Sequence, residues 1–231
     1  MANAPDAAPA VLFDIDGTLI DSNYLHVHAW CRAYDDVGIA VESWRIHRSI
    51  GMDGKRLLES LAGDADENTQ QRAKDLHLQY LKEMSPLLRP LPGTRELLER
   101  VRALGLQVVL ASSASEEELS LSRAVLEIDD LVSAATSSKD VDVAKPEPSI
   151  IEVALDRAGV DADHAVYVGD AVWDIVACRK AGVSSIGLLS GGVSREELEN
   201  AGAEAVYDNP GDLCDHVDST EIAALSSKSA G

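Results

Sequence analysis

The chain has 231 residues, 45% of them apolar and 26% charged, and its 40 acidic and 20 basic side chains give a formal net charge of −20. This length is enough for one large domain or for a domain with an insert, and the composition is typical of a water-soluble globule. The strong negative charge argues against nucleic acid or an anionic membrane as a partner.

The cysteines and the chain ends indicate where such a protein works. Cys31, Cys178 and Cys214 lie far apart, without the spacing of a metal site or a disulfide framework. No apolar run reaches the length of a membrane span, and the first residues lack the pattern of a secretion signal. We therefore expect a cytoplasmic protein, with disordered tails at residues 1–9 and from about 219 to 231.

The first predicted element is the unalternated apolar run 10–13, which leads directly into Asp14 and Asp16 and is ended by Gly17. Such a run is typical of a central strand buried on both faces. Its carboxyl end is where open α/β sheets bind ligands. Since two neighbouring carboxylates repel each other, the pair belongs either to a turn or to a site for a hard divalent cation.

The next part of the chain, residues 20–91, contains no convincing strand. Apolar residues at helical spacing predict helices at 24–37, 55–62 and 67–84, and a loop with two glycines at 49–54. An all-helical insert therefore follows the first strand directly. The segment 90–93, with two prolines and a glycine, marks the end of this insert.

Beyond the insert, helices and strands alternate. The predicted strands are 107–111, 131–135, 165–168, 185–189 and 205–207, and the predicted helices are 94–105, 116–126, 149–158 and 174–181. This alternation predicts βαβ units with right-handed crossovers and a parallel sheet.

Polar clusters follow several of these segments: Asp14 with Asp16, Ser112 with Ser113, Lys145, and Asp170 with Asp174. Because the carboxyl ends of parallel strands meet at one edge of a sheet, we expect these side chains to converge. Their types suit phosphoryl transfer, in which one carboxylate attacks phosphorus, another handles the proton, and cationic and hydroxyl groups hold the phosphate oxygens. Taken singly, each also suits a strand end, an exposed loop or a helix N-cap.

The set of motifs resembles that of the haloacid dehalogenase superfamily. The first motif is Asp14-Ile15-Asp16-Gly17-Thr18-Leu19, the second is Ser112 at a strand end, the third is Lys145 before Pro146, and the fourth is Gly169-Asp170 with Asp174. The motifs follow the family's order, and the resemblance spans about residues 10 to 217. It implies a Rossmann-like core at 1–22 and 92–231, with an inserted all-helical cap at 23–91.

The resemblance also implies the metal and the reacting groups. Asp14 would be the nucleophile and a ligand of Mg²⁺. Asp16 would be the general acid and base, and would bind the metal through its backbone carbonyl. Asp170 would complete the metal site. True dehalogenases lack the second aspartate of the first motif, because expelling a halide needs no proton donor, so the presence of Asp16 argues against that activity.

The remaining motif residues receive supporting roles from the resemblance. Ser112, Ser113 and Lys145 would hold the phosphate. Thr18 and Asp174 would lie behind the metal ligands, where Asp174 would pair with Lys145 or with a metal-bound water. An ordinary acidic residue in the first turn of a helix remains the alternative for Asp174.

The cap contributes three candidates: His26 at the hinge, and Gly51 and Lys55 at the two ends of a loop that resembles the substrate-specificity loop of helical caps. Both β-phosphoglucomutases and phosphatases of this group carry a histidine near the hinge. The mutases have an arginine where this chain has Gly54, which weakens the mutase interpretation. For Lys55, an ordinary solvated lysine is the alternative.

These observations predict a Mg²⁺-dependent phosphatase that hydrolyses a small phosphorylated metabolite, phosphoglycolate-like or sugar-phosphate-like, through an aspartyl-phosphate. The alternatives are a β-phosphoglucomutase-like mutase and a non-enzymatic phosphate-binding or partner-binding protein on the same fold. We expect a monomer, or else a dimer, with no nucleic-acid or membrane partner.

Overall fold

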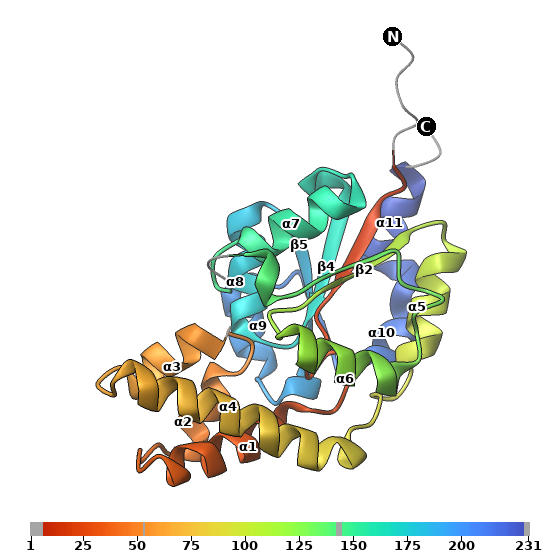
Figure 1. Cartoon of the computed structure of the whole chain (residues 1–231). Helices are drawn as coiled ribbons and strands as arrows, with labels where there is room; N and C mark the ends of the chain where they lie inside the picture. Colours follow the sequence, from red (N-terminus) through yellow and green to blue (C-terminus); the bar gives the residue numbers. More distant parts are fainter. Residues whose placement is uncertain (1–6, 53, 142–144, 229–231) are drawn as a thin grey trace.

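The computed structural model describes residues 7–52, 54–141 and 145–228 and contains one six-stranded parallel sheet (Figure 1). The strand order is β3-β2-β1-β4-β5-β6. The strands are β1 Ala10–Phe13, β2 Gln107–Ala111, β3 Ala134–Thr136, β4 Ala165–Gly169, β5 Ser184–Leu188 and β6 Ala205–Tyr207. All neighbouring pairs are parallel, which confirms the predicted α/β fold class.

Strand β1 lies in the middle of the sheet, and all four of its side chains are fully buried. Val11 and Phe13 face one hydrophobic core, whereas Ala10 and Leu12 face a second core on the other side of the sheet. A strand buried on both faces has no polar side to alternate with, which explains the continuous apolar run in the sequence.

Helices cover both faces of the sheet: α5 Thr94–Ala103, α6 Glu116–Leu126, α7 Ser149–Ala158, α8 Val172–Ala181, α9 Arg195–Ala201, α10 Pro210–His216 and α11 Glu221–Lys228. Apolar side chains of α7 and α8 join the core around Leu12. Those of α5, α10 and α11 join the core around Phe13. Short 3₁₀ turns complete the connections at Ser85–Leu87, Ser138–Asp140, Ala162–His164, Leu189–Gly191 and Val217–Ser219.

The disorder predicted for the chain ends is wrong for the parts of them that lie within the described residues, 7–9 and 219–228. Ile222 and Leu225 are 0% and 3% exposed in α11, because their spacing puts both on the face that packs against the sheet. At the other end, Gln107 donates backbone and side-chain hydrogen bonds to the carbonyls of Pro9 and Ala8. Residues 1–6 and 229–231 lie outside the described residues.

Between β1 and α5 the chain forms α1 Asn23–Asp36, α2 Ser43–Ser49, α3 Gly54–Ala62 and α4 Glu67–Met84. We call these four helices the helical layer. It lies beyond the carboxyl end of β1 and has its own core, in which Trp30, Tyr34 and Leu76 are buried (Figure 1). Helix α2 was not predicted, and Asp53, in the predicted two-glycine loop, lies outside the described residues. Among the described helices, none is both long and apolar enough to cross a membrane.

The two segments that join the helical layer to the rest of the chain run side by side. The backbone N–H of Asp21 donates to the Arg89 carbonyl, and that of Leu91 donates to the Leu19 carbonyl, both at 2.9 Å. Gly93 follows in a left-handed conformation with φ of +77° and caps α5. The two connecting segments are therefore hydrogen-bonded to each other, and the second leads directly into the core helix α5.

We predict that Gly93→Ala destabilises the protein more than Gly105→Ala. Both glycines have φ of +77°, but a Cβ at Gly93 would lie 2.3 Å from Gly211 Cα, whereas a Cβ at Gly105 would meet nothing within 4 Å. The left-handed conformation should cost each variant about 1 kcal/mol, and overpacking should bring the loss for Gly93→Ala to about 3 kcal/mol. Urea unfolding curves measure both losses. Equal losses would contradict the close approach to Gly211.

Candidate active site

A buried lysine organises the carboxyl edge of the sheet. Asp14 follows β1 directly, and its backbone N–H donates to the Val168 carbonyl of β4 at 2.9 Å. The Nζ atom of Lys145 lies 2.9 Å from Asp14 Oδ1 and 2.6 Å from Asp174 Oδ1. Lys145 is 0% exposed, so the alternative of a solvent-exposed loop lysine is wrong, and the predicted pairing with Asp174 is present.

Asp174 is held from three directions. One oxygen pairs with Lys145, and the other accepts the Ala171 backbone N–H at 3.0 Å. The Tyr167 hydroxyl lies 3.3 Å from Asp174 Oδ1 and 3.1 Å from the Ala111 carbonyl. Sequence analysis missed Tyr167, because a tyrosine inside a buried strand has the pattern of an ordinary core residue.

Asp170, after β4, faces the same place. The Thr18 hydroxyl donates to its Oδ1 at 2.7 Å, and the Asn23 side-chain amide donates to its Oδ2 at 2.9 Å. Carboxylate oxygens of Asp14, Asp170 and Asp174 all lie within 4.8 Å of one another. The structure therefore brings Thr18 to the predicted position and adds Asn23, the first residue of α1, which the sequence did not mark.

Among the described residues, the carboxylates of Asp14, Asp170 and Asp174 outnumber the one ammonium group, that of Lys145. Burial raises the pKa of Asp14 to about 7, although Lys145 acts in the opposite direction. Burial, followed by repulsion from Asp174 and Asp14, raises the pKa of Asp170 well above its ordinary value. Burial opposes the charge of Lys145, but the attraction of Asp14 and Asp174 is stronger and raises its pKa. Three buried carboxylates around one ammonium fit a divalent cation that prefers oxygen ligands, such as Mg²⁺.

Asp16 has different surroundings from Asp14. The Ser22 hydroxyl donates to its Oδ1 at 2.6 Å, and His26 Nε2 lies 3.2 Å from the same oxygen. Burial acts to raise the pKa of Asp16, but His26 and Ser22 together lower it below its ordinary value. Burial likewise opposes the charged form of His26, and Asp16 raises the pKa of the ring. The two neighbouring aspartates therefore have opposite pKa shifts, because burial dominates at Asp14 whereas the contacts with His26 and Ser22 dominate at Asp16.

A cavity of about 430 Å³ connects these groups with the helical layer. Its lining includes Asp14, Asp16, His26, Gly51, Lys55, Ser112, Ser113 and Lys145. All of these were predicted site residues. The other predicted site residues, Asp170, Asp174 and Thr18, are not in the lining and lie behind Asp14.

The predicted phosphate-binding serines and cap residues differ in how firmly they are held. Ser112 is 1% exposed, and its hydroxyl accepts the Ala114 backbone N–H at 3.0 Å. The Ser113 hydroxyl is buried and has no hydrogen-bond partner among the described residues. Gly51 approaches the core so closely that a Cβ there would lie 2.7 Å from Ala171 Cβ. The Lys55 side chain is 77% exposed and lies 4.0 Å from Glu59.

The protein has a parallel sheet with buried aspartates and a lysine at its carboxyl edge, and an inserted helical layer faces that edge. This combination is that of a Rossmann-like hydrolase. The model of the haloacid dehalogenase-like hydrolase family matches residues 11–188, which is more than half of the chain. The chain belongs to this family, as the order of its motifs predicted.

Individual relatives agree with this assignment. The chain is 31% identical to a phosphoglycolate phosphatase of Rhodospirillum rubrum over 221 residues, which cover 89% of each protein. It is 27% identical to (S)-2-haloacid dehalogenase 4A of Burkholderia cepacia, over 78% of this chain and 83% of that protein. The crystal structure of a hydrolase from Pseudomonas syringae superposes with a TM-score of 0.88 at 36% identity, covering 91% of this chain and 98% of that one.

We predict that Mg²⁺ stabilises the protein more at pH 8 than at pH 5.5. The pKa of Asp14 is about 7 in the folded protein against an ordinary value of 3.8, so this group's contribution to stability is lost as the pH rises through 7. A divalent cation binds the ionised carboxylates and offsets this loss, raising the melting temperature by about 5 °C at pH 8. Thermal unfolding in EDTA and in Mg²⁺ tests this prediction. Equal shifts at both pH values, or an undiminished shift in Asp170→Asn, would contradict it.

Proposed function

We propose that this hydrolase is a Mg²⁺-dependent phosphatase that acts through an aspartyl-phosphate on Asp14. The observation that carries the proposal is the convergence of Asp14, Asp16 and Lys145 at one buried edge of a cavity, with Asp170 buried behind them and a carboxylate oxygen within 4.8 Å of one of Asp14. Asp14, Asp170 and the backbone carbonyl of Asp16 would hold the cation. When bound, it would neutralise charge on the phosphate and on the carboxylates.

The residues of the chain divide the reaction between them. Asp14 Oδ attacks phosphorus while the bond to the leaving oxygen breaks, which transfers the phosphoryl group to the carboxylate. Lys145, Ser112 and Ser113 hold the phosphate oxygens. Asp16 gives a proton to the leaving oxygen and later takes one from the water that hydrolyses the acyl phosphate. Ser22 and His26 both contact Oδ1 of Asp16, which leaves Oδ2 to meet the leaving oxygen.

The helical layer is, in this proposal, a cap at 23–91 on a catalytic core formed by 1–22 and 92–231. Its paired tethers at Asp21 and Leu91 let it seat on the core as one body, with Gly51 and Lys55 at the cavity. A seated cap excludes water while Asp14 attacks, and an opened one admits the water that completes the reaction.

The proposed substrate is a small phosphorylated metabolite, phosphoglycolate-like or sugar-phosphate-like. The size of the cavity, about 430 Å³, and the similarity to a phosphoglycolate phosphatase support this class. The free cysteines Cys31, Cys178 and Cys214 support a cytoplasmic protein. A screen of phosphate release over a panel of about a hundred phosphorylated metabolites tests the proposal. Isomerisation of a sugar phosphate without net phosphate release would instead establish the mutase alternative.

Asp14→Asn should reduce phosphate release by at least about three orders of magnitude, because the amide cannot attack phosphorus. The matched control is Asp140→Asn, which alters an aspartate paired with Arg157. The control should retain wild-type turnover. An Asp14→Asn variant with a tenth of the wild-type rate would rule out Asp14 as the nucleophile.

Asp16→Asn should impair the hydrolysis of an alkyl phosphate more than that of p-nitrophenyl phosphate. An alkoxide leaving group needs a proton, whereas p-nitrophenolate is stable without one, so the difference should reach about a hundredfold in kcat/KM. Steady-state kinetics on glycerol 2-phosphate and p-nitrophenyl phosphate provide the comparison. Similar losses on both esters would show that Asp16 is not the proton donor.

A further inference from the structure

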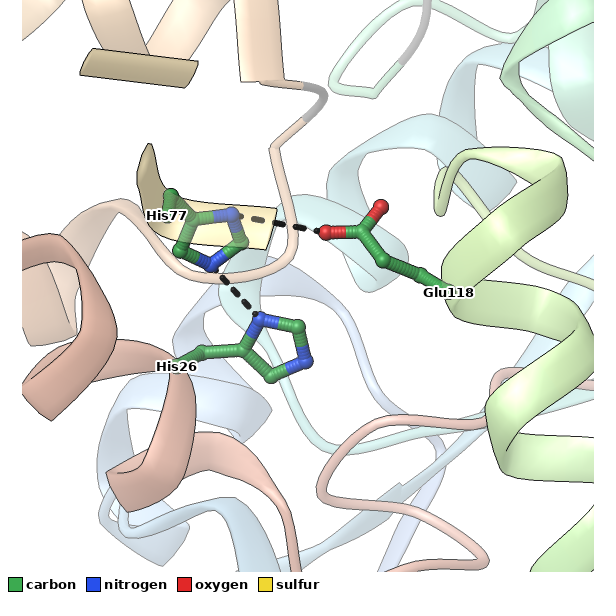
Figure 2. A group of neighbouring side chains, drawn as sticks. All are labelled: His26, His77 and Glu118. Atoms are coloured by element: carbon green, nitrogen blue, oxygen red, sulfur yellow. Dashed lines mark hydrogen bonds and ion pairs between the residues drawn. The ribbon is translucent and has the colours of Figure 1, made fainter. Parts of the chain in front are cut away.

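A line of four side chains leads from Asp16 away from the reacting atoms. His26 Nε2 lies 3.2 Å from Asp16 Oδ1, and the other ring nitrogen, Nδ1, lies 3.2 Å from His77 Nε2. His77 Nδ1 lies 3.5 Å from Glu118 Oε1. Figure 2 shows His77 between its two neighbours, with one ring nitrogen facing each of them. The proposed function uses only the first two members of this line.

Both imidazole rings are held rigidly. His26 and His77 are 8% and 3% exposed. Trp30 stacks on His77 with ring centroids 4.1 Å apart and planes inclined by 13°. Burial lowers the pKa of His77 well below its ordinary value, so this ring is neutral. A buried neutral imidazole has one donor and one acceptor nitrogen, and both need partners.

The position of Glu118 favours a proton on Nδ1 of His77. Its Oε2 accepts the Ser115 backbone N–H at 2.8 Å as part of the capping box of α6, which holds the carboxylate in place. Its Oε1 faces His77 Nδ1, where a negative charge favours the N–H form. His77 Nε2 is then the acceptor for an N–H on His26 Nδ1, and His26 Nε2 can also donate to Asp16 Oδ1 when the His26 ring carries both protons. The carboxylate therefore sets the direction of hydrogen bonding as far as the His26 ring.

The line crosses twice between the two parts of the protein. Asp16 and Glu118 belong to the part that contains the sheet, whereas His26 on α1 and His77 on α4 belong to the helical layer. The Asp16–His26 and His77–Glu118 contacts therefore form only while the helical layer is seated, whereas the His26–His77 contact lies within the layer. An exposed ion pair between Lys82 of α4 and Glu117 of α6 also connects the two parts, but it does not touch this line.

Two histidines and a carboxylate are also the ligands of many zinc sites, but the geometry here is that of hydrogen bonding. The ring nitrogens of His26 and His77 face each other across 3.2 Å, as in Figure 2. His77 turns Nε2 toward His26 and Nδ1 toward Glu118, so a single zinc ion cannot take ligand atoms from all three side chains as they are placed here.

We propose that His77 and Glu118 are positioning residues for Asp16. Acting through His26, they orient the proton donor only when the helical layer is seated on the core, so that protonation of the leaving group depends on closure. The proposal rests on the proposed function, in which Asp16 is the acid. Without the His77 contact, the His26 ring loses one of the two polar contacts that fix its orientation toward Oδ1 of Asp16.

The test replaces the carboxylate with its neutral isostere in Glu118→Gln. The amide oxygen can still accept the Ser115 N–H, but the amide NH₂ then faces His77 Nδ1 and reverses the favoured tautomer. We expect kcat for glycerol 2-phosphate to fall at least about tenfold and kcat for p-nitrophenyl phosphate to change less than about threefold. His77→Gln should give the same pattern. Glu117→Gln, which alters a neighbouring cavity-lining carboxylate and breaks its exposed pair with Lys82, should leave the ratio of the two rates unchanged.

Equal losses on both esters in Glu118→Gln, or the same change of ratio in Glu117→Gln, would overturn the proposal. A second readout does not depend on activity: ¹⁵N NMR of the histidine rings should show the Nδ1–H tautomer for His77 in the wild-type protein and its loss in Glu118→Gln. An Nε2–H tautomer in the wild type would overturn the proposal. A wild-type protein that hydrolyses neither these esters nor any member of the metabolite panel would refute the proposed function, and the tautomer measurement would still decide the direction of the hydrogen bonds.

Discussion

The structure depends on one buried ammonium group surrounded by more carboxylates than it can neutralise. Lys145 lies between Asp14 and Asp174, and Asp170 faces the same space. Removing one partner from such a buried pair costs roughly 3–5 kcal/mol, because the other charge is left without compensation. The fold supports this arrangement with a central strand buried on both faces, which holds Asp14 at a fixed height beside β4. Because burial and mutual repulsion raise the pKa of Asp14 and Asp170, a bound cation would stabilise their ionised forms.

The helical layer takes part in this electrostatic arrangement rather than merely covering it. Asn23, the first residue of α1, donates to Asp170, and His26, one turn later, contacts Asp16. On the far side of the cavity, Glu118 of α6 faces His77 of α4. Each contact joins a carboxylate of the sheet-containing part to a donor of the helical layer. The seating of this layer and the protonation state of these carboxylates therefore influence each other.

The family membership and the local chemistry answer different questions. Relatives of this chain include a phosphatase and a dehalogenase, so the shared fold does not select the reaction. In the proposed function Asp16 separates the two chemistries, because a phosphate ester expels an oxygen that needs a proton. The cavity wall supplied by the helical layer, with Gly51 and Lys55 among its residues, is where selection of the leaving group is expected.

The sequence by itself determined the parallel sheet, most of its helices and the polar groups at its carboxyl edge. Continuous apolar runs and helical spacing are local signals, and parallel topology brings every strand's carboxyl end to one edge. Helices α2, α9, α10 and α11 escaped prediction because they are short, and because contacts distant in sequence stabilise them: Ile222 and Leu225 bury themselves only once the sheet exists.

Only the tertiary structure decided which isolated residues join the site. Tyr167, Asn23, His77 and Glu118 belong to no motif, and each has an ordinary local explanation as a core, helix-start, helix-face or capping residue. Each contacts a residue that is separated from it along the chain: Tyr167 contacts Asp174, Asn23 contacts Asp170, His77 contacts His26, and Glu118 contacts His77. These separations are 7, 147, 51 and 41 positions. A contact between such residues exists only after packing fixes both side chains, so no local sequence pattern predicts it.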